Sequence, residues 1–464
     1  MSAGNPGTRT DETTLASGLT ARQVERAISF SYAQAMLGAV YGASTGGMFL
    51  IGYALMLGAD NVQIGMMSTI PMFCIGVQLL AAALVEGGVS RRLVTVVSAT
   101  GNVLGWLLII LIPHVLSGAS EHVRVGALIG VITVVTIFAY VAGNARGSWV
   151  GDLIPAQFRG SFFGRITMYS GMIGALFAII EGRFLDTLKS MGIGAFSYLF
   201  GFGVVVGLIN ASLFLPQPDV PLPRQNTEGF RYHVKQTLRN VPLMTVMLFA
   251  LLWSMQSIAG PFYSTFMIRD LKMSFLGIGL VNSVAIAAML LSGPFWGRMV
   301  DRYGCRAVLT ACSATLGVVQ LVWLFIDSST SAYLILPFAN VIAGLCIGGV
   351  SVALSTLIYK VTPSAGRSIQ FAVYSVIVTL AVAPMPVIGG FMPAWFARIT
   401  PGTDLRITFY ACVPLLLAAS LVARRIREPD SRPTRDLLKS LPSHVMEVWQ
   451  RYVPFVFPFG RGVD

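Results

Sequence analysis

The chain has 464 residues, of which 55% are hydrophobic and only 11% are charged, and its formal net charge is +12. Soluble domains carry about 25% charged residues, so most of this chain does not face water. The basic residues lie in short polar segments that are too small to build a basic nucleic-acid-binding face, so we expect no nucleic-acid partner.

Apolar segments long enough to cross a lipid bilayer, which takes about 20 residues as a helix, recur along the whole chain. Helix is the expected structure because backbone groups in lipid must be satisfied within the segment. We therefore predict an all-α integral membrane protein with twelve transmembrane helices in two six-helix, pseudo-symmetric halves. The predicted spans lie near residues 31–57, 62–85, 93–114, 123–145, 166–185, 196–215, 243–266, 275–296, 307–326, 332–357, 369–393 and 407–423.

Polar segments divide the chain into regions, with both termini expected in the cytoplasm. Fourteen basic residues lie in the even-numbered turns against seven in the odd-numbered ones, and such a bias marks the cytoplasmic side. We expect the plasma (inner) membrane, and an interfacial helix in the tail, with a disordered tail as the alternative. The regions are a cytoplasmic N-terminal segment (1–27), an N-terminal half (28–215), a cytoplasmic linker (216–242), a C-terminal half (243–424) and a cytoplasmic tail (425–464).

Two loop segments recur in corresponding places of the two halves. The sequence GRMVDRYGCR, residues 297–306, follows the eighth span, and ALVEGGVSR, residues 83–91, follows the second in matching register. Asp152 to Gly160 follows the fourth span and matches Lys360 to Ser368 after the tenth. In both of these segments a proline precedes an arginine by four residues, which indicates an internal repeat.

Residues 297–306 resemble the G-x-x-x-D-R-x-G-x-R loop signature of the major facilitator superfamily, and residues 152–160 are similar to its loop after span 4. The first-half copy departs from the signature, since Glu86 replaces the aspartate and Gly87 the following arginine. The resemblance, over about residues 25–425, implies a commonly monomeric secondary transporter whose loops lock the cytoplasmic side when it faces outward. Helix capping and solvation are the alternative for Asp301. The gate candidates are Glu86, Arg91, Asp152, Arg159, Gly297, Asp301, Arg302, Gly304, Arg306 and Arg367.

Polar side chains near the middle of the spans are the candidates for binding a substrate, because transporters of this plan bind between their halves. Amides and aromatic rings suit a small polar or amphipathic organic solute. For each residue the alternative is a hydrogen bond that joins two helices. The candidates are Tyr41, Ser44, Thr45, Tyr140, Asn144, Trp253, Gln256, Asn282 and Tyr374.

Glu181 is the candidate for coupling, because an ionisable residue in lipid is costly and is a functional hypothesis by default. It lies toward the outer end of span 5, with Arg183 and Asp186 close in sequence. An ion pair at the outer mouth and a proton site both remain open. The scarcity of other central charges favours a neutral or weakly charged solute.

The five cysteines and four histidines show no metal or redox spacing, so we expect free thiols, no metal and no cofactor. A membrane-embedded enzyme would need acidic or histidine residues in an aqueous loop, and the longest internal loop has few, so we expect no enzyme. A transporter-like sensor or assembly factor is the main alternative to a transporter. The expected partners are a small-molecule substrate, the lipid bilayer and, as an open alternative, a coupling proton.

Overall fold

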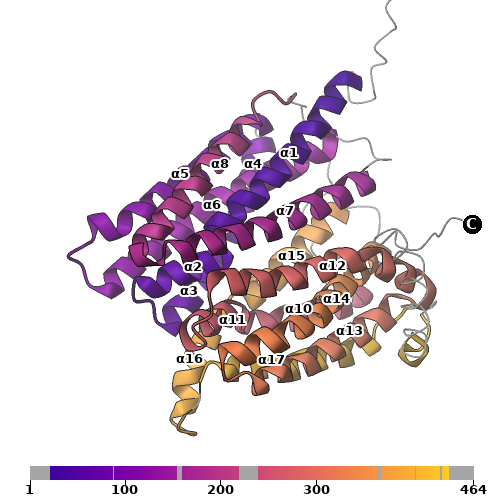
Figure 1. Cartoon of the computed structure of the whole chain (residues 1–464). Helices are drawn as coiled ribbons and strands as arrows, with labels where there is room; N and C mark the ends of the chain where they lie inside the picture. Colours follow the sequence, from indigo (N-terminus) through magenta and orange to yellow (C-terminus); the bar gives the residue numbers. More distant parts are fainter. Residues whose placement is uncertain are drawn as a thin grey trace, which may run out of the picture.

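The computed structural model describes residues 21–86, 88–153, 159–218, 239–362, 367–402, 404–428 and 431–437. These residues form two bundles of helices that lie side by side (Figure 1). The predicted linker falls mostly on 219–238, and the interfacial tail helix mostly on 438–464. Both segments lie outside the described residues.

The N-terminal bundle begins with a span that is broken at a glycine. The break lies at Gly47, whose φ of +52° is a left-handed conformation that favours glycine. The second span is also broken, by one turn of 3-10 helix that follows Pro71. The elements are α1 (Ala21–Thr45), α2 (Gly47–Met56), α3 (Asn61–Phe73), η1 (Cys74–Gly76), α4 (Val77–Glu86), α5 (Arg91–Val115), α6 (Glu121–Leu153), α7 (Arg159–Thr187) and α8 (Ile193–Ser212).

The C-terminal bundle also has six spans, but its breaks lie elsewhere. Spans 7 and 11 of the chain are broken, and span 9 ends in a 3-10 helix. The eleventh span breaks at Pro384, inside the Pro- and Gly-rich stretch APMPVIGG, residues 383–390. The elements are α10 (Val241–Ser254), η4 (Met255–Ile258), α11 (Gly260–Thr265), η5 (Phe266–Asp270), α12 (Phe275–Tyr303), α13 (Cys305–Val319), η6 (Gln320–Phe325), α14 (Ser329–Val361), α15 (Arg367–Val382), α16 (Met385–Ala397) and α17 (Arg406–Arg424).

The predicted all-helical membrane architecture is confirmed. Within the described residues, eleven segments are long and apolar enough to cross a membrane, and the remaining predicted span is the interrupted α3–η1–α4. Long, mostly apolar helices of this kind satisfy their backbone groups internally, as lipid requires.

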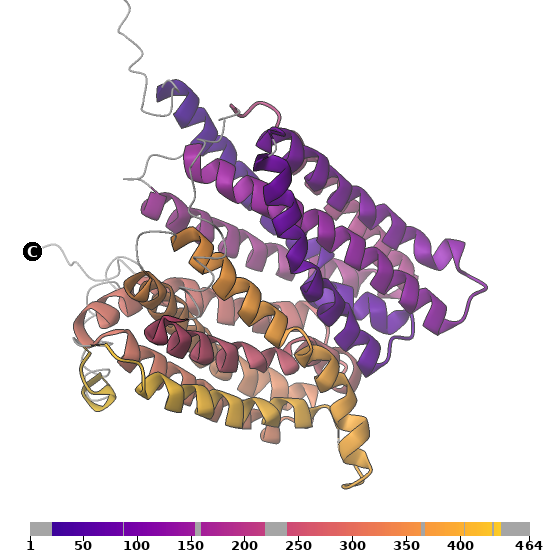
Figure 2. The ribbon, with the colours of Figure 1, turned by 180° about the vertical axis from the view of Figure 1, so that it is seen from behind.

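The two bundles meet at one end of the molecule. We call the end where α1 begins and α17 ends the terminal end, and the opposite end the far end. Figures 1 and 2 show the bundles converging near α3 and α16 at the far end and spreading apart toward the terminal end. Among the described residues, the hydrogen bonds between the bundles join α3, α7, η5, α12 and α16, from the middle of α7 to the far end.

Candidate functional site

Asp186, in the last turn of α7, joins the two bundles at the far end. Its two carboxylate oxygens accept hydrogen bonds from the backbone N–H groups of Phe275 and Leu276, at 3.0 and 2.9 Å. These are free N–H groups of the first turn of α12, where a negative charge also meets the positive end of the helix dipole. Asp186 therefore caps a helix of the opposite bundle.

Small residues let the backbones of the two bundles touch. A Cβ atom added to Gly65 of α3 would lie 2.5 Å from the carbonyl oxygen of Pro386 in α16. A Cβ atom on Gly390 would lie equally close to the carbonyl oxygen of Asn61. Close backbone approach at small residues is a general device of helix association in membranes. The far end is thus closed by direct backbone contact.

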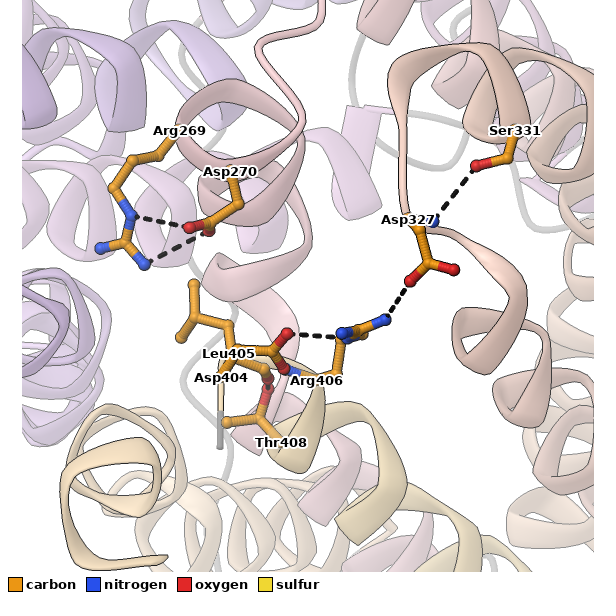
Figure 3. Close-up of polar contacts among 8 residues, drawn as sticks. All are labelled: Arg269, Asp270, Asp327, Ser331, Asp404, Leu405, Arg406 and Thr408. Carbon is orange, nitrogen blue, oxygen red and sulfur yellow. Dashed lines mark hydrogen bonds and ion pairs between the residues drawn. The ribbon is translucent and has the colours of Figure 1, made fainter. Parts of the chain in front are cut away.

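Charged residues at the far end also brace the C-terminal bundle (Figure 3). The guanidinium of Arg406 bonds to Asp327 at 2.7 Å and to Asp404 at 2.8 Å, so it ties the segment before α14 to the start of α17. Arg269 pairs with Asp270 at 3.3 Å and also donates to the side chain of Asn61 in the other bundle, at 2.7 Å. Exposed ion pairs of this kind contribute about 0–1 kcal/mol each.

A pocket of about 200 Å³ lies within the C-terminal bundle, and we call it the C-half pocket. Its lining residues include amides and aromatic rings, and none of them is Asp, Glu, Lys, Arg or His. Two substrate candidates, Gln256 and Asn282, line it. Its other polar and aromatic members are Tyr263, Gln320, Trp323 and Asn340.

Hydrogen bonds fix one end of several amides in the C-half pocket. Tyr263 donates to Oε1 of Gln320 at 2.9 Å, Nδ2 of Asn340 donates to the carbonyl of Val281 at 2.8 Å, and Nε2 of Gln256 donates to the carbonyl of Trp253 at 2.9 Å. Each amide has a second polar atom that none of these bonds uses. The pocket can therefore offer both donors and acceptors to a solute.

A second pocket, of about 150 Å³, lies within the N-terminal bundle, and we call it the N-half pocket. Tyr41 lines it and donates to Oδ1 of Asn102 at 2.8 Å. Arg146 and Asn210 line the same pocket. The structure therefore separates the candidates, because Tyr41 belongs to a different pocket from Gln256 and Asn282.

Glu181 is buried between α7 and α1, together with two further candidates. Its Oε1 accepts a hydrogen bond from Ser44 at 2.5 Å, and its Oε2 is buried without a partner among the described residues. Thr45 is also buried and donates to the carbonyl of Tyr41. Arg183 is exposed, and within the described part of the chain no cation lies at ion-pair distance from Glu181.

The remaining substrate candidates do not line either pocket. Trp253 stacks on Phe249 of its own helix with 6.4 Å between ring centroids. Tyr140 and Asn144 are half-buried on α6, and Tyr374 is half-buried on α15.

The gate candidates after span 8 surround a helix cap that the sequence analysis missed. Gly304 has a φ of +86°, and Asp301 and Arg302 are exposed. The N–H of Arg306 donates to Glu428 at 2.9 Å. A carboxylate from beyond α17, and not Asp301, thus meets the first turn of α13.

Glu428 also bonds to Nζ of Lys360 at 2.9 Å, which joins the ends of three helices. Burial alone would raise the pKa of Glu428, but the bonds from Arg306 and Lys360 outweigh it and hold the pKa below the ordinary 4.5.

The other gate candidates lie on α4, α5, α6, α7, α12 and α15. The side chains of Glu86, Asp152, Arg159 and Arg367 lie outside the described residues. Arg91 is buried at the start of α5, and Gly297 lies half-buried in α12. A cytoplasmic lock made by these residues stays a prediction.

Comparison with known proteins places these features in a known fold. Residues 243–457 match the model of the Major Facilitator Superfamily, and no curated protein sequence matches the chain. The nucleoside transporter NupG is 14% identical, with a TM-score of 0.64 over 87% of this chain and 98% of that one. A bacterial homologue of the iron transporter ferroportin, in an inward-facing state, is 15% identical, with a TM-score of 0.66 over 87% and 98%.

A bacterial homologue of the human lysosomal transporter Spinster, inward-facing and unoccupied, is 14% identical, with a TM-score of 0.62 over 91% of this chain and 99% of that one. At such identities the likeness concerns the fold, and it extends over both bundles.

Proposed function

We propose that this chain carries a small neutral polar solute across the membrane by alternating access. The chain belongs to the major facilitator superfamily. The C-half pocket is the observation that supports this proposal. Amides from four elements surround about 200 Å³ of space with no Asp, Glu, Lys, Arg or His in the lining. A few convergent polar groups in an otherwise apolar pocket are typical of sites for small organic ligands.

The far-end contacts support an inward-facing state. With the basic loops in the cytoplasm, the terminal end faces the cytoplasm and the far end faces outward. The far end is closed by Asp186 and by the contact of Gly65 with Pro386. Transport then requires that these contacts break while the terminal ends of the bundles approach each other. One chain carries both pockets and the whole closure, so we propose that it works as a monomer.

Glu181 is the proposed site of a coupling proton. It lies next to Gly182, whose added Cβ atom would be 2.7 Å from the carbonyl oxygen of Phe275 in the other bundle. Separation of the bundles at the far end would therefore uncover this region to water. A carboxylate with one unpaired buried oxygen is costly in lipid, so proton exchange would accompany that opening.

The proton proposal has a direct test in reconstituted vesicles. We expect Glu181→Gln to abolish uptake driven by a pH gradient and to leave solute exchange intact. Retention of proton-driven uptake would contradict a coupling role. Loss of both activities together with a normal melting profile would instead indicate a role in solute binding.

The solute proposal is tested by thermal stability of the purified chain against nucleosides, sugars and neutral amino acids, since a ligand of the folded state raises Tm. Gln320→Leu should weaken binding of the responding solute about fivefold, because one hydrogen bond is worth about 1 kcal/mol. Gln78→Leu makes the same chemical change on α4, outside the pocket lining, and should leave binding unchanged. Equal affinity of the two variants would reject the C-half pocket as the site.

A further inference from the structure

The N-half pocket contains a cation, which the C-half pocket does not. Its polar lining residues are Tyr41, Thr95, Asn102, Arg146 and Asn210, and Phe214 closes one side. Its volume of about 150 Å³ is similar to that of an engineered protein cavity that holds a benzene molecule. A group of about six heavy atoms therefore fits, which is enough for the hydroxyl-bearing half of a small hydroxy acid.

Arg146 lies on α6, one residue before the end of the apolar segment Glu121–Gly147. Its guanidinium carbon lies 5.1 Å from the centre of the Phe214 ring, a cation–π contact that orients the group. Among the described residues, no carboxylate lies within ion-pair distance of Arg146. An arginine in a span normally pairs with an anion or faces a water-filled cavity, so the site lacks the partner that its charge calls for.

Two asparagines that line the N-half pocket differ in their hydrogen bonds. Asn102 accepts from Tyr41 and donates to the carbonyl of Val135, both at 2.8 Å, so both ends of this amide are occupied. Oδ1 of Asn210 is buried without a partner among the described residues. A buried acceptor left unpaired costs about 1–3 kcal/mol. A ligand that donates a hydrogen bond to Asn210 would remove this cost.

The C-terminal bundle shows that the fold does not need these polar groups. In the register of the repeated loops, Leu354 is the residue of the second half that corresponds to Arg146, and Gly317 corresponds to Asn102. In the C-terminal bundle, Gly317 packs closely against Leu416 of α17. Equivalent positions can thus be apolar or small, which favours a binding role for the polar set over a purely structural one.

We propose that the N-half pocket binds a small organic anion. The carboxylate or phosphate group of the anion pairs with Arg146, and a hydroxyl or amine beside it donates to Oδ1 of Asn210. A free metabolite and a lipid headgroup can both supply this chemistry. The site is separate from the C-half pocket, so its failure would leave the proposed solute site standing.

The test uses the full chain in an uncharged detergent, with Tm measured against malate or inorganic phosphate and with sodium chloride at matched ionic strength. Malate or phosphate at ten times its Kd should raise Tm by about 2 °C, and chloride should not. Arg146→Gln should lose the shift. Arg298→Gln, which removes one exposed positive charge from α12, should keep it.

A second arm separates the two sources of the anion. The chain is placed in nanodiscs that contain phosphatidylglycerol or phosphatidylcholine alone. A lipid headgroup is the occupant if phosphatidylglycerol raises Tm, if this rise depends on Arg146, and if malate and phosphate have no effect. Absence of any response in both arms would overturn the proposal, and so would an equal response of Arg146→Gln and the wild-type chain.

A further variant covers the case in which Arg146→Gln does not fold. Asn210→Leu keeps the charge and removes the acceptor, so about five times more malate should be needed for the same shift, since one hydrogen bond of about 1 kcal/mol is lost. An unchanged malate response in this variant would refute the contact with Asn210.

Discussion

Removal of the Asp186 carboxylate should open the far end of the molecule. Asp186→Ala deletes two hydrogen bonds, of 3.0 and 2.9 Å, to the first turn of α12. Loss of a helix cap costs about 0.5–2 kcal/mol, and loss of a negative charge near a helix N-terminus costs a further 0.3–1 kcal/mol or so. A total of about 2 kcal/mol would raise the ratio of open to closed far ends about 30-fold.

Spin labels can measure this opening directly. Lys189 and Lys272 are exposed on opposite bundles, near Asp186 and Phe275 respectively. With labels at these two positions, Asp186→Ala should add a longer distance to the distribution of the parent chain. Asp404→Ala is the matched control, because Asp404 bonds to Arg406 within one bundle (Figure 3). An unchanged distribution in Asp186→Ala, or the same change in both variants, would refute the reasoning.

Two further substitutions test the far end and the tail. Gly65→Ala places a Cβ atom 2.5 Å from a carbonyl oxygen of α16, so we expect a loss of stability of about 1–3 kcal/mol in thermal unfolding, whereas Gly76→Ala, which has open space, should cost less. Glu428→Gln should lower Tm at pH 7. Because the pKa of Glu428 lies below 4.5, its ionised form stabilises the fold above that pH, and the difference in Tm should shrink as the pH falls below 4.5.

Much of the architecture could be predicted because bilayer thickness sets the length of a helical span. The predicted spans match the helices. Other details follow from tertiary contacts that composition does not reveal. Asp186 lies three residues from Arg183, yet it bonds to a helix about 90 residues away.

The candidate site was harder to predict, because hydropathy reports depth in the membrane and not the direction of a side chain. Gln256 and Asn282 do line a pocket, but Tyr41, at a similar depth, lines the other one. Gln320 was missed because it lies near the end of a span, where polar residues are common. Arg146 was assigned to a basic loop, whereas the structure continues α6 past it.

The chemistry of the far-end interface also bears on how the proposed transporter can work. The bundles meet there through glycines against backbone, as Gly182 meets Phe275, and through a few hydrogen bonds. Each such hydrogen bond contributes about 1 kcal/mol net, so the closed far end is favoured by a few kcal/mol and not by tens. Separation exposes small residues and backbone groups that are already satisfied within their helices. A solute with a modest difference in affinity for the two states is then sufficient to shift the balance between them.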